Sequence, residues 1–293
     1  MVFFLFAFVS EAWNLISGYG GQFSLAHAAF FGVGAYATAI SYVDYGLSPW
    51  FGLLIGGLLG VVVSLVVGFA TFKLRQFFFV LSTLACSEAI HALFTYWRMK
   101  VPTGLGTTIP RSPGFMNLTF NSELPYTMIS YALLFIIVII IWFINQTRIN
   151  YFLRAIKNDE DAAICMGVNV FKVKLLIFSI SAFFTAVGGG FYGMYNLYIE
   201  PDNIFNVDLM IQYIVFSIVG GMATIPGPII GTMVLLPLTV FFRGWIGGLM
   251  APLGFFMYGI LLVIVILVVP GGILQGIKSF ATLVFKKPET TSR

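Results

Sequence analysis

Apolar stretches about twenty residues long recur from one end of this chain to the other, and they limit its possible folds more than any other feature. A helix needs about 20 residues to cross roughly 30 Å of hydrocarbon. Charged residues make up 9% of the chain, whereas soluble domains have about a quarter. The mean hydropathy is +0.99. The sequence therefore predicts an all-α integral membrane protein.

Dividing the chain at clusters of glycine, proline and polar residues gives nine apolar segments, so we expect a polytopic bundle of about 8–10 transmembrane helices. The segments are 1–17, 25–43, 50–70, 76–97, 126–145, 173–197, 209–225, 228–243 and 250–269. Pro226-Gly227-Pro228 separates two short ones, which predicts broken or re-entrant helices there. The polar stretches are too short to form a core, so residues 1–293 are expected to form a single transmembrane domain.

The distribution of basic residues predicts the orientation, because Lys and Arg favour cytoplasmic loops. With residues 148–174 inside the cell, only Arg98, Lys100, Arg111 and Arg243 of the fifteen Lys and Arg residues fall outside. The C-terminus is then cytoplasmic and the N-terminus external. This asymmetry accounts for the net charge of +4, so we expect a lipid bilayer as the environment and no nucleic-acid partner.

Glycines at helical spacing predict close contacts between helices. Gly52, Gly56 and Gly60 share one helix face, and Gly227 and Gly231 share another. Small residues at this spacing let helix backbones approach each other. We expect packing within the chain in preference to a contact with a partner subunit.

Three glycines at 18, 20 and 21 predict a break in a helix inside the membrane. The backbone groups freed by such a break need protein partners or a watery cavity. A broken helix beside a transport pathway and a structural turn on the cytoplasmic side both fit this pattern. The candidate pathway residues, chosen as polar groups in apolar surroundings, are Asn14, Gln22, Ser24, His27 and Glu88.

Glu88 and His91 are three residues apart within one predicted span and therefore share a helix face. An ionisable pair inside a membrane is a functional candidate, although a hydrogen-bonded pair that joins helices is slightly the better explanation. Glu-x-x-His also forms half of a di-iron site. His27 and His91 are the only histidines, so we expect no metal or other cofactor.

Nothing in the sequence indicates an enzyme. The chain has no Gly-x-x-x-x-Gly-Lys-Ser/Thr motif, so it is not expected to hydrolyse ATP through a P-loop. It also offers no constellation of nucleophile, base and acid.

The polar stretch 146–172 contains the strongest local signal. Asn158 is a good N-cap for a short helix whose first turn holds acids, where the helix dipole favours them. Gly167 can end this helix in the left-handed conformation, and Asn169 is expected to cap the next span. Small residues in such a helix would let it enter a groove of a partner, although an ordinary surface helix fits equally well.

Four blocks of sequence carry a resemblance to a known family. They are NLISGYGGQFSLAHAAFFGVGAY (14–36), LSTLACSEAI (81–90), RAIKNDEDAAICMG (154–167, continuing to Lys174) and VGGMATIPGPIIG (219–231). They resemble, in order, the permease subunits of the branched-chain amino acid ABC importers, the LivH/LivM-type family, and are closer to the LivM type.

The resemblance implies an importer built from several subunits in a bacterial or archaeal plasma membrane. Its other parts would be a second homologous permease, two cytoplasmic ABC ATPases and an extracytoplasmic solute-binding protein. The third block matches the loop by which such permeases couple to the ATPase. The residues at its positions are Arg154, Glu160, Ala162, Ala163 and Gly167.

Two other functions remain open. Related permeases carry urea or short amides in the same kind of importer. A secondary transporter working alone, with Glu88 as its proton site, belongs to a different class. A transported branched-chain amino acid is the first expectation.

Overall fold

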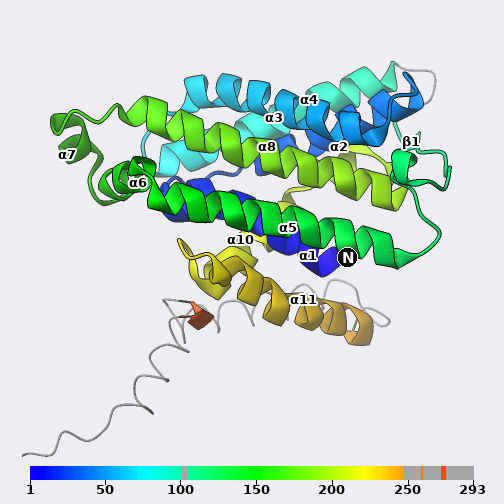
Figure 1. Ribbon diagram of the computed structural model, residues 1–293. Helices are drawn as coiled ribbons and strands as arrows, with labels where there is room; N and C mark the ends of the chain where they lie inside the picture. Colours follow the sequence, from blue (N-terminus) through cyan, green and yellow to red (C-terminus); the bar gives the residue numbers. More distant parts are fainter. Residues whose placement is uncertain (101–104, 247–258, 260–271, 275–293) are drawn as a thin grey trace, which may run out of the picture.

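The computed structural model describes residues 1–100, 105–246, 259 and 272–274, and it is a bundle of helices (Figure 1). The helices are α1 (Val2–Asn14), α2 (His27–Val43), α3 (Pro49–Thr71), α4 (Phe77–Met99), α5 (Glu123–Gln146), α6 (Arg148–Asn158), α7 (Glu160–Cys165), α8 (Val170–Asn196), α9 (Pro201–Ile204), α10 (Val207–Gly221) and α11 (Pro226–Ile246). Leu15–Tyr19 continues α1 as a π-helix, η1, and Phe115–Asn117 is a 3-10 turn, η2.

Within the described residues, six helical segments are long and apolar enough to cross a membrane. They are Val2–Tyr19, Pro49–Thr71, Phe77–Met99, Glu123–Gln146, Val170–Asn196 and Pro201–Gly221. The predicted span at 228–243 corresponds to Pro226–Phe241 of α11, a shorter apolar helix. The predicted span at 25–43 corresponds to α2, a helix of 17 residues. The span predicted at 250–269 lies outside the described residues apart from Gly259. The polytopic helical fold is confirmed.

Close backbone contacts join α2, α3 and α8. Gly52 and Gly56 of α3 face Thr38 and Gly34 of α2, at distances that leave little room for a side chain. A Cβ atom on Gly34 would overlap the backbone carbonyl of Ala186 in α8. Hydrophobicity does not draw helices together within lipid, so this close packing supplies the attraction. The prediction that these glycines pack within the chain is confirmed.

Glycines also join α10 to α11. A Cβ atom on Gly220 would overlap the carbonyl of Gly227, and one on Gly231 would overlap that of Phe216. The chain reverses between the two helices at residues 222–225, where Ala223 has a φ of 59°. The predicted boundary between two helices is confirmed, with Pro226 as the first residue of α11, and the prediction that these helices are broken or re-entrant stays a prediction.

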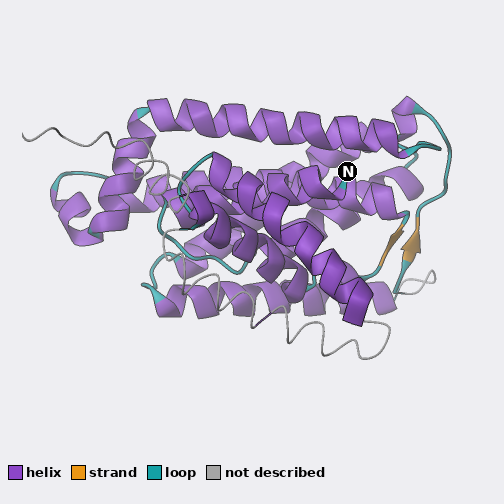
Figure 2. Cartoon of the chain, turned by 90° about the horizontal axis from the view of Figure 1, so that it is seen from below, coloured by secondary structure: helices purple, strands orange, loops and turns teal. Residues whose placement is uncertain are grey.

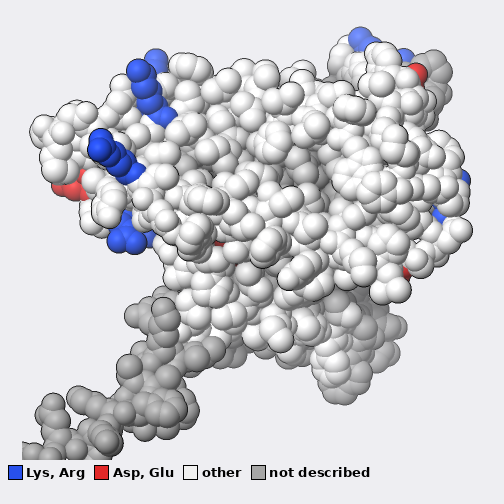
Figure 3. Space-filling view, viewed as in Figure 1, with Lys and Arg blue, Asp and Glu red and all other residues white. Residues whose placement is uncertain are grey.

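The two ends of the bundle differ. The pair α6 and α7 lies at one end, and two short antiparallel strands, β1 (Thr107–Thr108) and β2 (Tyr198–Ile199), lie at the other (Figures 1 and 2). The sequence predicted helices alone, and these two short strands differ from that prediction. Lys and Arg side chains gather at these two ends, and few charges interrupt the middle of the face in Figure 3. This is the pattern that a membrane belt requires.

The helix α6 was not predicted from the sequence. Its buried side chains are Asn150, Leu153 and Ile156, which recur every three residues and form one face against the bundle. The stretch 146–172 is therefore two short helices, α6 and α7, and not a loop with a single helix.

Candidate functional site

The helix α7 is the short helix that the sequence predicts, but its cap differs. The side chain of Asp159 accepts hydrogen bonds from the backbone N–H groups of Asp161 and Ala162 at 2.9 and 3.0 Å. Asn158 is the last residue of α6 instead. The prediction of Asn158 as the cap is wrong by one residue, because α6 continues through it. Gly167 has a φ of +83°, as expected for a helix end.

Ion pairs fix α7 to two neighbouring elements. Lys174 of α8 donates to Glu160 at 2.6 Å, and the lysine side chain is only 3% exposed. Arg75, in the turn between α3 and α4, donates to both carboxylate oxygens of Asp161 at 2.7 and 3.0 Å. This guanidinium lowers the pKa of the Asp161 carboxyl. Arg75 and Lys174 were not among the predicted site residues. Arg75 is 86 residues from Asp161, and the pairing of Lys174 with Glu160 depends on how α7 folds back on α8.

The exposed side of this helix is partly apolar. Ala163 is buried against α6 and α8, whereas Ala162 is exposed. Ile164 and Met166 are 51% and 70% exposed. Asn169 accepts from the N–H of Lys172 at 3.1 Å and caps α8, as predicted.

A polar cavity of about 490 Å³ is lined both by this loop and by the segment after the break in the first helix. Its lining includes Gln22 and Phe23 of the broken segment, Arg75 and Gln76 of the α3–α4 turn, and residues 156–161 of the loop. Of the predicted pathway residues, Gln22 is the one that lines it. Both candidate regions of the sequence therefore meet around one cavity.

The predicted break in the first helix is confirmed. Gly20, which follows η1, keeps right-handed helical dihedral angles, and the chain leaves helical geometry at Gly21, whose φ is +68°. Ser17 donates to the carbonyl of Gln22 at 3.0 Å. Trp13 donates to the carbonyl of Ser24 at 2.9 Å, and the Ser24 hydroxyl accepts from the N–H of Ala26. The freed backbone groups thus find partners in the protein.

Asn14 joins the first helix to the turn between α10 and α11. Its side-chain amide donates to the carbonyl of Thr224 at 3.0 Å, and its oxygen accepts from the N–H of Ala223 at 2.9 Å. The carboxyl group of Glu11, which is fully buried, lies 3.4 Å from the same amide. Glu11 was not predicted, although an acid within an apolar span is a visible signal.

His27 is also buried within the chain. Its Nε2 atom lies 2.7 Å from the hydroxyl of Ser181, which in turn donates to the carbonyl of Ala12. The ring packs edge-on against Phe30 and Phe178. His27 therefore connects α1, α2 and α8. Asn14, Ser24 and His27 all use polar atoms for contacts within the fold.

Glu88 lies on an exposed face at the middle of α4. Its carboxylate is 3.6 Å from Nδ1 of His91, and its side chain is 53% exposed. Nε2 of His91 lies 3.1 Å from Asp202 of α9, and its ring stacks on Phe205. The predicted proximity of Glu88 and His91 is confirmed, and His91 also joins two helices.

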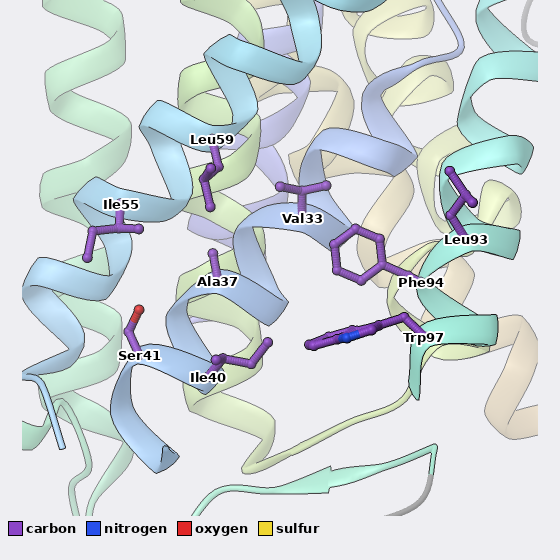
Figure 4. Close-up of a pocket in the computed structure, with 9 residues that line it drawn as sticks. All are labelled: Val33, Ala37, Ile40, Ser41, Ile55, Leu59, Leu93, Phe94 and Trp97. Atoms are coloured by element: carbon purple, nitrogen blue, oxygen red, sulfur yellow. The ribbon is translucent and has the colours of Figure 1, made fainter. Parts of the chain in front are cut away.

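A second cavity, of about 420 Å³, is apolar and lies among α2, α3 and α4 (Figure 4). Its lining residues are Val33, Ala37, Ile40, Ser41, Ile55, Leu59, Leu93, Phe94 and Trp97. The hydroxyl of Ser41 and the indole N–H of Trp97 are the polar groups among these side chains. The cavity suits hydrocarbon better than a charged solute, and we assign it no role in transport.

The family model described as "Branched-chain amino acid transport system / permease component" matches residues 1–266. The chain belongs to this family. This permease chain is thus a transport subunit by family, and its helical, multi-pass architecture agrees with that membership.

Three relatives with low sequence identity to this chain are each named as a LivM branched-chain amino acid transport permease protein. The high-affinity branched-chain amino acid transport system permease protein LivM of Escherichia coli (strain K12) is 23% identical over 213 residues, 65% of this chain and 50% of the relative. LivM of Salmonella typhimurium is 22% identical with the same coverage. The probable LivM of Methanocaldococcus jannaschii is 20% identical over 234 residues, 76% of this chain and 67% of the relative.

The match spans half the length of the first two relatives. No solved structure matches this permease chain.

Proposed function

We propose that this permease chain is a membrane subunit of an ATP-driven importer of branched-chain amino acids. Its partners in the proposal are a second homologous permease, two cytoplasmic ABC ATPases and an extracytoplasmic binding protein that delivers the solute. Family membership supports the class. The observation that carries the coupling is the short capped helix α7, held at one end of the bundle by two ion pairs.

The proposed docking element is α7 with the residues that follow it to Gly167. Ile164 and Met166 expose apolar surface at the tip of the α6–α7 end, which is the kind of patch that a partner covers. Exposed Ala162 leaves space for a close approach. Glu160 contributes indirectly, because its carboxylate is bound to Lys174. In this proposal the α6–α7 end faces the cytoplasm, as the distribution of Lys and Arg favours.

The proposed transport pathway runs along the face of α4 that carries Glu88. A charged side chain facing lipid near the middle of a span costs about 2.5–3.5 kcal/mol. The α4 face also carries exposed Ala85, Ala89 and Ala92. Its acid adjoins His91, whose other ring nitrogen contacts Asp202. We place this face away from lipid, beside water and the second permease.

The helix α5 provides the contrast. It is similarly exposed, yet its exposed residues between 128 and 143 carry no charge and include Tyr131, Phe135, Trp142 and Phe143. Such a surface suits lipid. Gln22 is proposed to line the cytoplasmic end of the pathway, whereas Asn14, Ser24 and His27 would support it from behind.

The test is purification of the chain in mild detergent, with identification of the proteins that accompany it. We expect a second permease and two P-loop ATPases. Uptake by the reconstituted complex should then require ATP and favour leucine, isoleucine and valine. Uptake of urea or a short amide instead would change the substrate but not the class.

An ion-coupled transporter is the alternative that Glu88 keeps open. Proteoliposomes containing this chain alone, with a proton gradient and no ATP, would then accumulate the solute. That result would overturn the proposal, and loss of this uptake in Glu88→Gln would identify the proton site.

A further inference from the structure

One lysine of the α6–α7 pair reaches the broken end of the first helix. Lys157 of α6 donates from Nζ to the carbonyl oxygen of Gly18 in η1, at 2.8 Å. Carbonyl groups at a helix C-terminus lack partners within the helix and carry partial negative charge. A cation suits this position, and the contact joins segments 139 residues apart.

The glycines of the break make room for this contact. Gly21 has a φ of +68°, and a Cβ atom there would lie 2.9 Å from Cγ of Lys157. A Cβ atom on Gly18 would overlap the side-chain oxygen of Asn14 and lie 2.7 Å from the backbone nitrogen of Ala223. The glycine cluster therefore does more than break a helix, because two of its members admit groups from other parts of the chain.

The first helix is also joined to the turn between α10 and α11, close to Gly18. Lys157 holds η1 at Gly18, and Asn14, one turn earlier, holds the turn between α10 and α11 through Ala223 and Thr224. A third cavity, of about 300 Å³, is lined by residues of α6, by Gly18 and by Ala223. Lys157 lines both this cavity and the polar cavity of about 490 Å³, so α6 is incompletely packed where it meets η1.

We propose that Lys157 is a positioning residue that transmits movement of the α6–α7 pair to the broken end of the first helix, and through Asn14 to the α10–α11 turn. The inference rests on the proposed function as an ATP-driven importer. Coupling between distant sites requires contiguous contacts between elements that can shift as units. Here the contacts are the hydrogen bond from the Lys157 ammonium to the Gly18 carbonyl and the hydrogen bonds of the Asn14 side-chain amide with the α10–α11 turn.

The test compares variants in the assembled, reconstituted transporter. Lys157→Met keeps the apolar stem beside Gly21 and removes the charged donor. We expect the amount of solute imported per ATP hydrolysed to fall about tenfold, the range of one hydrogen bond to a charged group. Subunit assembly should persist. Lys157→Arg should restore most of the ratio, because it keeps a cationic donor. Lys172→Met, which removes an exposed lysine of the same basic region, should leave the ratio unchanged.

A second variant covers the case in which Lys157→Met does not fold. Gly21→Ala keeps Lys157 in the sequence, but the added methyl group displaces the lysine side chain from Gly18. This variant should therefore lower the same ratio. An unchanged ratio of solute imported to ATP hydrolysed in every assembled variant would overturn the inference. It would also be overturned if Lys157→Met lowered this ratio and Lys157→Arg lowered it equally. If the wild-type chain purifies without an ATPase, the proposed function itself fails, which is a distinct result.

Discussion

The α2–α3–α8 core and the α6–α7 pair are held by different forces. In the core, backbones touch through glycines such as Gly34, and a single methyl group would overlap a neighbouring carbonyl. The α6–α7 pair buries a small apolar cluster around Ile156 and Ala163, and ion pairs, a side-chain cap and one long lysine make its other contacts. Close-packed interfaces do not deform gradually, whereas polar contacts beside cavities can exchange partners. From this difference we expect movement at the junction of α6 with the broken helix and a rigid core.

The largest effect is expected from Gly34→Val in the core. The new side chain meets the backbone of Ala186, which no change of rotamer relieves, so we expect a loss of about 3 kcal/mol or more. The yield of monodisperse protein in detergent and its thermal midpoint measure this loss. Gly114→Val is the matched control, because a Cβ there meets its nearest atom at 3.8 Å. A normal yield and midpoint for Gly34→Val would contradict the rigid core.

Reversal of charge at Glu160 comes next. Glu160→Lys leaves Lys174 buried without its acid and adds a second cation. Because the Glu160 side chain is a quarter exposed, we expect a loss of stability of about 2 kcal/mol, which is less than for a fully buried pair. Transport should fall at least about tenfold, with normal insertion into the membrane.

The exchange Glu160→Lys with Lys174→Glu sharpens this prediction. It restores an ion pair, so transport should recover in part if Glu160 acts by positioning α7. No recovery would assign the Glu160 carboxylate to direct contact with the ATPase. Normal uptake by Glu160→Lys alone would refute both roles.

Gly167→Val tests the end of α7 through its backbone alone. Nothing lies within 4 Å of a Cβ atom there, but the φ of +83° suits glycine. We expect a cost of about 1–3 kcal/mol and reduced uptake with insertion intact. Gly167→Asn should be milder, since asparagine tolerates this conformation. Equal uptake by Gly167→Val and wild type would show that the position of α7 is not important.

The smallest effect is expected from Asp161→Asn, because this pair with Arg75 is exposed. Arg75 lowers the pKa of Asp161, so the stabilisation is complete above the ordinary aspartate value of about 3.9. It disappears only as the pH falls through the lowered value. Hydrogen exchange of α7 should therefore increase slightly in Asp161→Asn, and equally at pH 6 and pH 8. A difference between these two pH values would assign the effect to another group.

Local features of this chain could be predicted from its sequence. Apolar length predicted the membrane-spanning helices, and Gly167 and Asn169 marked the boundaries of α7 and α8, because caps and left-handed glycines depend on neighbouring residues. The cap at Asp159 was missed by one residue. Asn158 and Asp159 both suit an N-cap, and the choice depends on where α6 ends.

Contacts between distant segments could not be predicted. Lys157 with Gly18, and Asn14 with Thr224, are separated by 139 and 210 residues. A polar residue in apolar surroundings indicates that it needs a partner, but not which one. For His27 the partner is Ser181. Glu88 is also a polar residue in an apolar span, but its side chain lies on an exposed face. The sequence does not distinguish the buried His27 from the exposed Glu88, whereas the fold does.

Cross-linking from α7 tests the docking of an ATPase most directly. Cys165 is exposed at the end of α7. In a Cys86→Ser background it can be labelled with a benzophenone maleimide before the ATPase subunits are added back. Illumination of the assembled transporter should join this permease chain to a P-loop ATPase. Adducts that never contain an ATPase, from a complex that still imports solute with ATP, would contradict the assignment of α7.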